Sequence, residues 1–176
     1  MTEPSADPLP LGLAAGREEA FEALYDRYAA RLYRAALGML GRSADAEDAV
    51  GEVFVAMVRS REKLAGVRDL TSYVFAALRH AAVRCASRRA RAGQALRAAA
   101  AEAAGQAKRA DCGDPRADRL DEALRALPAE QREVIALKVD GELTFAEIGE
   151  VLGVSVNTAA SRYRYALESL RRRLVR

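Results

Sequence analysis

Apolar residues recur every three or four positions along most of this chain, which is the spacing of helices with one buried face. The first such pattern follows residue 17 and consists of Phe21, Leu24, Tyr25, Tyr28, Leu32 and Leu37. The second follows Ser43 or Asp45 and consists of Ala46, Val50, Val53, Phe54 and Met57. The third consists of Leu70, Val74, Ala77, Leu78 and Ala81. This patterning predicts an all-α protein.

Residues 143–174 predict two further helices that meet at a glycine, as in a helix-turn-helix. Thr144 and Glu147 have the spacing of a capping box, Gly153 suits the positive φ of a tight helix exit, and Ser155 is a favourable N-cap. The expected inward residues of the second helix are Val156, Ala159, Tyr163, Ala166, Leu167 and Leu170. Its expected outward residues are Asn157, Thr158, Ser161, Arg162, Arg164 and Tyr165. Such side chains can contact base edges and phosphates, whereas the alternative is an ordinary helical hairpin with a solvated basic end.

The chain divides into two small helical domains joined by a flexible linker. Residues 1–16, with three prolines, predict a flexible lead, and residues 17–91 hold the first three helices. Residues 92–116 are dominated by Ala, Gly, Arg and Gln and predict the linker. A fresh amphipathic pattern and Pro128, well placed at a helix start, make residues 117–176 a four-helix domain that ends in the helix-turn-helix.

Charge and composition narrow the possible functions. The formal net charge is only +3, but acidic residues gather before about residue 52 and basic residues follow residue 84 and close the chain. This asymmetry suggests a nucleic acid on one side and a basic protein partner on the other, although solvated helix faces are an equal alternative. Cys85, Cys112 and His80 lack metal-ligand spacing, so no metal or other cofactor is expected. No apolar run is long enough to span a bilayer, and a cytoplasmic protein is expected.

The third helix carries a second stripe besides its apolar face. Tyr73, His80, Arg84 and Arg88 follow one another at intervals of seven and four. An aromatic ring and an imidazole aligned with guanidinium groups can stack on unpaired bases while the cations hold phosphates. A helix whose polar face happens to be basic is the alternative.

Three features together resemble bacterial RNA polymerase sigma factors of the extracytoplasmic-function (ECF) class in the sigma-70 family. DAEDAVGEVF at residues 45–54 resembles the family's polymerase-binding helix. LPAEQREVIALKVDGELTFAEIGEVLGVS at residues 127–155 is close to the family's LP, QRE, EIA and LG phrases. The spacing of a promoter-opening domain, a variable linker and a C-terminal helix-turn-helix also matches. The resemblance covers nearly everything from residue 20 to residue 174.

The resemblance implies a sigma region 2 at residues 17–91, a sigma region 4 at residues 117–176, and no enzymatic activity. Its implied partners are core RNA polymerase, through the clamp helices of the β′ subunit, promoter DNA, and an anti-sigma factor. The implied polymerase-binding residues are Asp48, Gly51, Glu52 and Val55. Those implied for the melted −10 element are Lys63, Arg68, Tyr73, His80, Arg84 and Arg88. The outward residues of the last helix are implied to bind the duplex −35 element, with Arg162 expected on phosphate.

Several positions depart from the family pattern. Gly51 stands where Gln is usual, His80 replaces a frequent Asn and Tyr73 a frequent Trp. In the last helix, Ala159 and Ala160 replace a usual Val-Lys pair and Tyr165 replaces an Arg. These departures favour an altered promoter specificity. They also leave open a degenerate sigma-like protein that binds polymerase or a regulator without initiating, or a stand-alone helix-turn-helix regulator.

Overall fold

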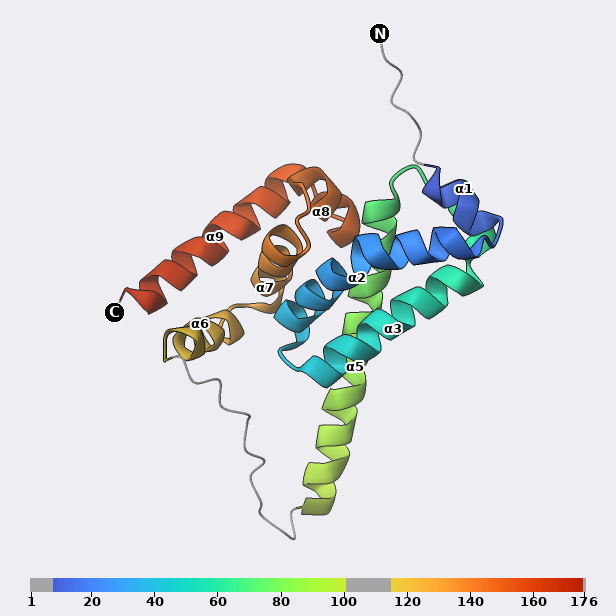
Figure 1. Cartoon of the computed structure of the whole chain (residues 1–176). Helices are drawn as coiled ribbons and strands as arrows, with labels where there is room; N and C mark the ends of the chain where they lie inside the picture. Colours follow the sequence, from blue (N-terminus) through green and yellow to red (C-terminus); the bar gives the residue numbers. More distant parts are fainter. Residues whose placement is uncertain (1–7, 101–114, 176) are drawn as a thin grey trace.

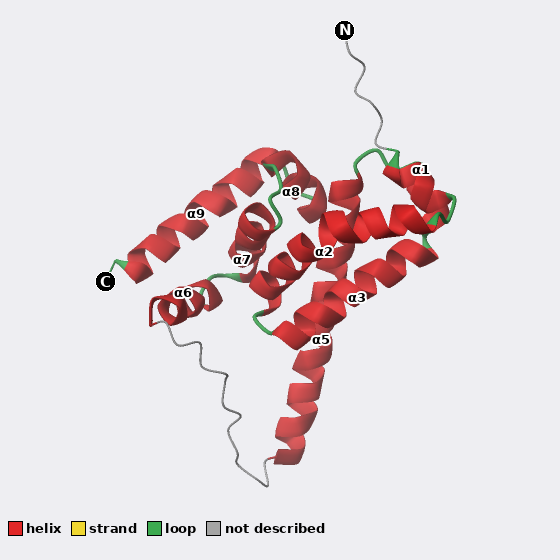
Figure 2. Cartoon of the chain, viewed as in Figure 1, coloured by secondary structure: helices red, strands yellow, loops and turns green. Residues whose placement is uncertain are grey.

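The computed structural model describes the backbone of residues 8–100 and 115–175, and this described part of the chain is helical without strands (Figures 1 and 2). The helices before the gap are α1 (Leu9–Ala14), α2 (Glu18–Leu40), α3 (Ser43–Arg59), α4 (Arg61–Leu64) and α5 (Leu70–Ala100). Those after it are α6 (Pro115–Arg125), α7 (Ala129–Ile135), the π-helical turn η1 (Ala136–Asp140), α8 (Phe145–Leu152) and α9 (Val156–Leu174). The predicted all-α class is confirmed.

Helices α2, α3 and α5 form the bundle expected from the first three apolar patterns, with α3 packed against both of the others. Leu24, Leu32 and Val53 are completely or almost completely buried where these helices meet, and Tyr28 is buried with them. The Tyr28 hydroxyl lies 3.0 Å from Thr71 Oγ1, so a polar group inside the bundle keeps a hydrogen-bond partner. The bundle positions the outward faces of α3 and α5.

The segment before α2 differs from the expected flexible lead. Residues 9–14 form α1, and Leu9 and Leu13 are buried. Helix α1 packs against α2 and α4, so its two leucines add apolar area to the same core. The sequence predicted a flexible segment because of its prolines, and two leucines alone are too few to show a helical spacing. Pro10, however, is compatible with the first turn of a helix.

The expected linker is partly helical at its edges. Helix α5 continues from Leu70 to Ala100, and α6 begins at Pro115, where the fixed φ of proline suits a helix start. Residues 101–114, with Cys112, lie outside the described part of the chain. The predicted domain boundaries therefore stay predictions within that interval.

The two halves of the chain pack against each other through one hydrophobic core (Figure 1). Helix α2 contacts η1 and α7, and α5 contacts α8. Val134, Leu137, Leu143 and Ile148 from the second half are completely buried in the same cluster as the bundle residues. A smaller cluster between α6, α7 and α9 belongs to the second half alone and includes Leu127 and others. The interface between the halves is thus a core in its own right.

A polar contact anchors this interface at the end of η1. Arg31 of α2 donates from Nε, at 3.0 Å, and from Nη2 to the carbonyl oxygen of Gly141, and its guanidinium lies 5.4 Å from the centre of the Phe75 ring. The next residue, Glu142, has φ 58°, and its carboxylate accepts from Arg34 Nη2 at 3.1 Å. A non-glycine residue in the left-handed region has a strained backbone. The contacts of Arg31 and Arg34 help to hold the backbone of Glu142 in this conformation.

Candidate functional site

The helix-turn-helix is formed by α8 and α9 as predicted. Thr144 Oγ1 accepts from the backbone N–H of Glu147 at 3.2 Å, and Glu147 Oε2 accepts from the backbone N–H of Thr144 at 2.6 Å. Gly153 ends α8 at φ 68°, and Ser155 Oγ accepts from the backbone N–H of Thr158 at 3.1 Å. These caps satisfy the free amides at the start of both helices, and they fix the angle at which α9 leaves the turn.

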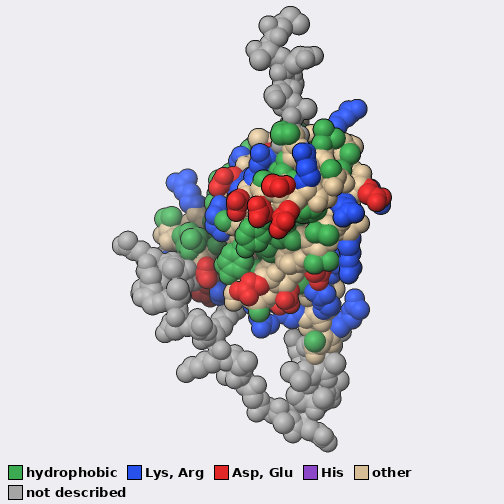
Figure 3. Space-filling view, turned by 45° about the vertical axis from the view of Figure 1, so that its right-hand side comes forward, with side chains coloured by type: hydrophobic (Ala, Val, Ile, Leu, Met, Phe, Trp, Pro, Cys, Tyr) green, Lys and Arg blue, Asp and Glu red, His purple; other side chains and the backbone are tan. Residues whose placement is uncertain are grey.

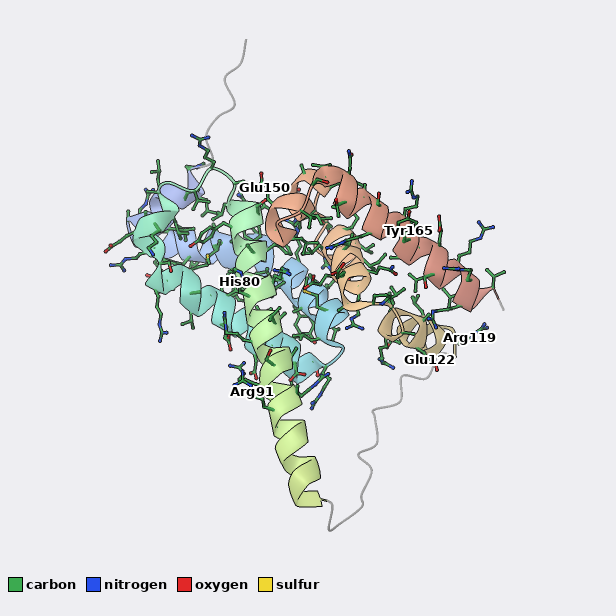
Figure 4. All side chains as sticks on the ribbon, turned by 180° about the vertical axis from the view of Figure 1, so that it is seen from behind. His80, Arg91, Arg119, Glu122, Glu150 and Tyr165 are labelled. Atoms are coloured by element: carbon green, nitrogen blue, oxygen red, sulfur yellow. The ribbon has the colours of Figure 1, made fainter. Side chains whose placement is uncertain are left out.

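The outer face of α9 presents most of the residues that were predicted to bind duplex DNA. Asn157, Thr158, Arg164 and Tyr165 are exposed, and we refer to these four as the α9 outer face; Tyr165 is labelled in Figure 4. The Arg164 guanidinium lies 5.3 Å from the centre of the Tyr165 ring, within the range of a cation–π contact. The tyrosine that stands at an arginine position therefore orders a neighbouring arginine.

Two other predicted members of this face are less available. Ser161 and Arg162 are half-buried, and Arg162 Nη2 lies 2.7 Å from Glu130 Oε2. This pair neutralises Arg162 locally, although a phosphate could replace the exposed Glu130 carboxylate. Arg162 stays a predicted phosphate contact rather than a base contact.

The inward stripe predicted for α9 was wrong at two positions. Val156 is 49% exposed and Leu167 is 45% exposed, whereas Ala159, Ala166 and Leu170 are buried. Val156 occupies the first turn, before the helix reaches the core, and Leu167 follows a buried residue and so lies off the stripe. Ala159 has no exposure at all, so its replacement of the usual valine concerns packing and not the DNA side.

Helix α3 presents an acidic and apolar strip to solvent. Asp48, Gly51, Val55 and Val58 are exposed, and we refer to these four as the α3 outer face. A Cβ atom added at Gly51 would have no other atom within 4 Å, so this position is open. Figure 3 shows apolar and acidic side chains side by side on the face that it turns toward the viewer.

An aromatic pair extends the apolar surface from α3 onto α2. Tyr25 was expected to face inward but is 58% exposed, and its ring lies 5.2 Å from the half-buried ring of Phe54. The expectation was wrong because Tyr25 is the direct neighbour of the buried Leu24, and adjacent positions on a helix differ by about 100°. The spacing of apolar residues along the sequence did not predict that the Tyr25 ring and Val58 are exposed.

Glu52 is the predicted polymerase-binding residue that does not face solvent freely. Its Oε2 accepts from Arg84 at 3.2 Å (Nε) and 2.8 Å (Nη2), and its Oε1 accepts from Arg88 Nη2 at 2.7 Å. The hydrogen bond from Arg84, followed by that from Arg88, holds the pKa of the Glu52 carboxyl below its usual value against the opposing effect of burial. Two predicted DNA-binding arginines therefore meet a predicted polymerase-binding carboxylate.

The remaining −10 candidates lie near the start of α5. Lys63 belongs to the short helix α4, and both it and Arg68 are exposed. Tyr73 is half-buried against the core, and His80 is exposed on α5 (Figure 4). Helix α8, whose Glu150 is labelled in the same view, packs against α5.

The turn before α5 is held by a residue that the sequence reasoning did not single out. Asp69 Oδ1 accepts from the backbone amides of Thr71 and Ser72 at 2.9 and 3.2 Å. An aspartate just before an apolar helical pattern is the usual N-cap signal, so it could have been found. Asp69 thus caps the start of α5, the helix that carries Tyr73.

Metal clusters and membrane-crossing helices were sought in the described residues. They contain no cluster of three or more His, Cys, Asp or Glu side chains with metal-binding geometry. Cys85 is buried, and its sulfur accepts from Arg88 Nη2 at 2.9 Å. None of the described helices combines the length and the apolar character that a membrane crossing needs.

Two families of known proteins match different parts of this chain. Residues 24–92 match the sigma-70 region 2 family, and residues 117–170 match the sigma-70 region 4 family. The ECF RNA polymerase sigma factor SigL of Mycobacterium tuberculosis is 31% identical over 163 residues, which cover 91% of this chain and 92% of SigL. The ECF sigma factor SigK of Mycobacterium bovis is 31% identical over 173 residues, which cover 94% of this chain and 91% of SigK.

Two solved structures share the fold. One is CnrH in complex with the cytosolic domain of CnrY, with a TM-score of 0.64, 24% identity and coverage of 92% of each chain. The other is the sigma factor RpoE of Bartonella quintana in complex with the anti-sigma factor NepR, with a TM-score of 0.68 and 20% identity, covering 89% of this chain and 97% of RpoE. Since relatives that align over nine tenths of the chain are ECF sigma factors, and the region 2 and region 4 matches occur in order, the chain belongs to the ECF class of the sigma-70 family, whose members are DNA-binding factors for transcription initiation.

Proposed function

We propose that this chain binds core RNA polymerase and directs it to promoters, reading a −35 element as duplex and holding a −10 element as melted strand. The observation that carries the proposal is the exposure, on one chain, of the α9 outer face beside a capped helix-turn-helix and of the α3 outer face. Each surface supplies what its target requires: hydrogen-bonding groups for DNA and acidic plus apolar groups for a basic protein helix.

Polymerase is expected to dock on the α3 outer face. Asp48 and Val55 are exposed, and Asp48 has no ion pair among the described residues. A free carboxylate can approach the basic clamp helices of the β′ subunit without first breaking a bond, and the adjacent valines can bury apolar area. Gly51 offers no side chain there, so the contact is smaller than one made with the family's usual glutamine.

The α9 outer face is expected to lie in the major groove of the −35 element. Asn157 and Thr158 stand in the first turn, which is the part of a recognition helix that reaches base edges. Arg164 lies two turns further on, and its planar fork can bind a guanine or a phosphate. The basic last turn, Arg171, Arg172 and Arg173, is suited to phosphates.

The −10 strand is expected along α4, the turn at residues 65–69 and the exposed side of α5. Lys63, Arg68 and His80 are exposed there, and Tyr73 is partly accessible. Cations attract the phosphates, and the flat rings of Tyr73 and His80 can stack on flipped bases. Initiation then needs no chemistry from this chain, since nucleotide joining belongs to the polymerase.

The two DNA surfaces cannot be used together in the packed arrangement. Their numbering places the −35 and −10 elements about 25 base pairs apart, which is about 85 Å at about 3.4 Å per base pair, whereas a compact chain of this length is about 40 Å across. The second half must therefore leave the bundle when both elements are bound. Opening breaks the ion pair in which Arg79 Nε of α5 lies 3.5 Å from Glu133 of α7, and it exposes apolar residues of the shared core, so binding of both elements has to supply this free energy.

An anti-sigma factor is a further expected partner. The two solved structures described above are complexes, one with CnrY and one with the anti-sigma factor NepR. A protein that covered the α3 outer face would compete directly with polymerase. Purified anti-sigma protein should then displace this chain from polymerase, with Asp48→Lys weakening both complexes.

Run-off transcription tests the proposal. Purified chain and core polymerase are incubated with a promoter library, and transcripts and polymerase association are measured. Asp48→Lys should abolish polymerase binding while the far-UV circular dichroism and melting of the chain stay unchanged. Polymerase binding without any transcript would instead identify a non-initiating sigma-like protein, and promoter-duplex binding without polymerase would identify a stand-alone regulator.

A further inference from the structure

Glu52 joins two arginines that were expected to act on DNA. It stands on α3, with 28% of its side chain exposed, and faces Arg84 and Arg88 on α5, whose side chains are both 56% exposed. Each carboxylate oxygen is taken by a different guanidinium, at 2.8 Å for Arg84 Nη2 and 2.7 Å for Arg88 Nη2. The carboxylate therefore bridges two cations that lie one helical turn apart.

The bridge leaves a usable edge on both arginines. A guanidinium has five N–H groups. Arg84 uses Nε and one Nη2 group on Glu52, and Arg88 uses Nη2 on Glu52 and on the Cys85 sulfur. The Nη1 groups have no partner within the described residues, and the trio keeps a net charge of +1. Two forks held in fixed planes with free donors are suited to consecutive phosphates of a strand.

The same bonds make Glu52 a poor polymerase contact. A basic helix of the polymerase would have to displace two arginines that are already hydrogen-bonded, whereas Asp48 is exposed and free of ion pairs among the described residues. Asp48 and Glu52 stand one turn apart in the sequence of α3, but only Asp48 faces outward. The two acidic residues therefore have different tasks.

We propose that Glu52 is a positioning residue for DNA: it orients Arg84 and Arg88 of α5 to hold phosphates of the melted −10 strand, and it does not contact polymerase. The inference rests on the proposed function, since it assigns a role within the same promoter-opening region. It moves Glu52 from the polymerase-binding group to the DNA-binding group and leaves Asp48, Gly51 and Val55 on the polymerase side.

Two readouts separate the roles. Affinity for core polymerase is measured with the full chain, and binding of the resulting holoenzyme to a single-stranded −10 oligonucleotide is measured alongside its opening of a duplex promoter. Glu52→Gln keeps the size of the side chain and removes its charge. It should leave polymerase affinity within about twofold and weaken strand binding about three- to tenfold, because charge-assisted hydrogen bonds at a partly exposed site are lost.

The sign of the effect distinguishes positioning from simple charge. Removing a carboxylate makes the surface more positive, so a purely electrostatic role predicts tighter strand binding. Arg84→Lys keeps the charge and loses the fork, and it should weaken strand binding as Glu52→Gln does. The double variant should lose less than the product of the two single effects, since both changes disrupt one unit.

Asp45→Asn is the matched control. Asp45 also stands on α3 and pairs with an arginine of α5, Arg89, at 3.0 Å, but neither residue belongs to the proposed surfaces. This variant should change thermal stability about as much as Glu52→Gln and leave both binding readouts unchanged. Loss of strand binding in Asp45→Asn would show that the α3–α5 ion pairs only stabilise the fold, and would overturn the assignment.

The remaining outcomes are also decisive. Loss of polymerase affinity in a folded Glu52→Gln variant would make Glu52 a polymerase contact and overturn the inference, whatever the effect of Asp48→Lys. Unchanged strand binding in Glu52→Gln would reduce the bridge to packing and overturn it too. If the wild-type chain binds polymerase, a negative result with these variants overturns the inference about Glu52 and leaves the proposed function standing. If the wild-type chain does not bind polymerase, both the inference and the proposed function are overturned.

Discussion

Replacing Gly51 with alanine should stabilise this protein. Gly51 lies inside α3 (Ser43–Arg59), where glycine costs conformational entropy that alanine does not. Apart from the backbone of its own helix, a Cβ atom at this position has nothing within 4 Å, so the substitution creates no clash and buries no new group. The full difference in helix propensity should therefore be expressed, which is about 0.5–1 kcal/mol in the free energy of unfolding.

Thermal and urea unfolding, followed by circular dichroism, measure this gain. For a chain of this length the melting temperature should rise by about 1.5–3 °C. Ala86→Gly is the matched control, because Ala86 is an exposed alanine inside α5 and the reverse change should lower the melting temperature by a similar amount. A Gly51→Ala variant that is no more stable, or less stable, than the wild type would refute the reasoning about open space at this position.

A second substitution at the same site connects stability to function. Gly51→Gln should gain most of the helix propensity of alanine and, in addition, present a side chain on the α3 outer face. If polymerase docks there, Gly51→Gln should bind core polymerase more tightly than Gly51→Ala, since both share the helical gain. Equal affinities of the two variants in a competition assay would place position 51 outside the interface.

Three further predictions concern the packed halves and the DNA surface. Arg31→Met should weaken the contact between α2 and the end of η1 by about 1.5–3 kcal/mol, because two hydrogen bonds from a charged guanidinium to the Gly141 carbonyl oxygen are lost. Faster amide hydrogen exchange in α8 would confirm this weakening, and unchanged exchange would contradict it. Burial, opposed by the charge of Arg34, raises the pKa of Asp140, so the folded state holds this proton more tightly and the free energy of unfolding falls as the pH rises above the ordinary aspartate range. Asp140→Asn should flatten this decline when urea midpoints are measured against pH, and an unaltered pH dependence would argue against the assignment. Arg164→Ala should cost about 1–3 kcal/mol on the preferred −35 sequence if Arg164 reads a base, whereas equal losses on all duplexes would restrict it to phosphate.

Local chemistry was readable from the sequence because it depends on neighbours along the chain. The capping box of Thr144 and Glu147, the positive φ of Gly153 and the cap at Ser155 were all predicted and found. Each is a contact between residues three or four positions apart, or the preference of one residue for its own backbone angle. For the same reason the helices that carry the candidate surfaces were predicted.

Other features were decided by tertiary structure. Which of two adjacent apolar residues is buried depends on the partner helix, and Tyr25 and Leu167 proved exposed. The two halves share one core, and Arg31 of α2 contacts Gly141, 110 positions further along the chain, at the end of η1.

The division of labour between Asp48 and Glu52 has the same origin. By itself the sequence determined that α3 carries acidic residues on its polar side and that α5 carries arginines at intervals of four. Only the packing of α3 on α5 decided that Glu52 meets Arg84 and Arg88 while Asp48 stays free. Helical periodicity gives the angle of each side chain around its own axis, but the partner it meets depends on how two helices cross in space.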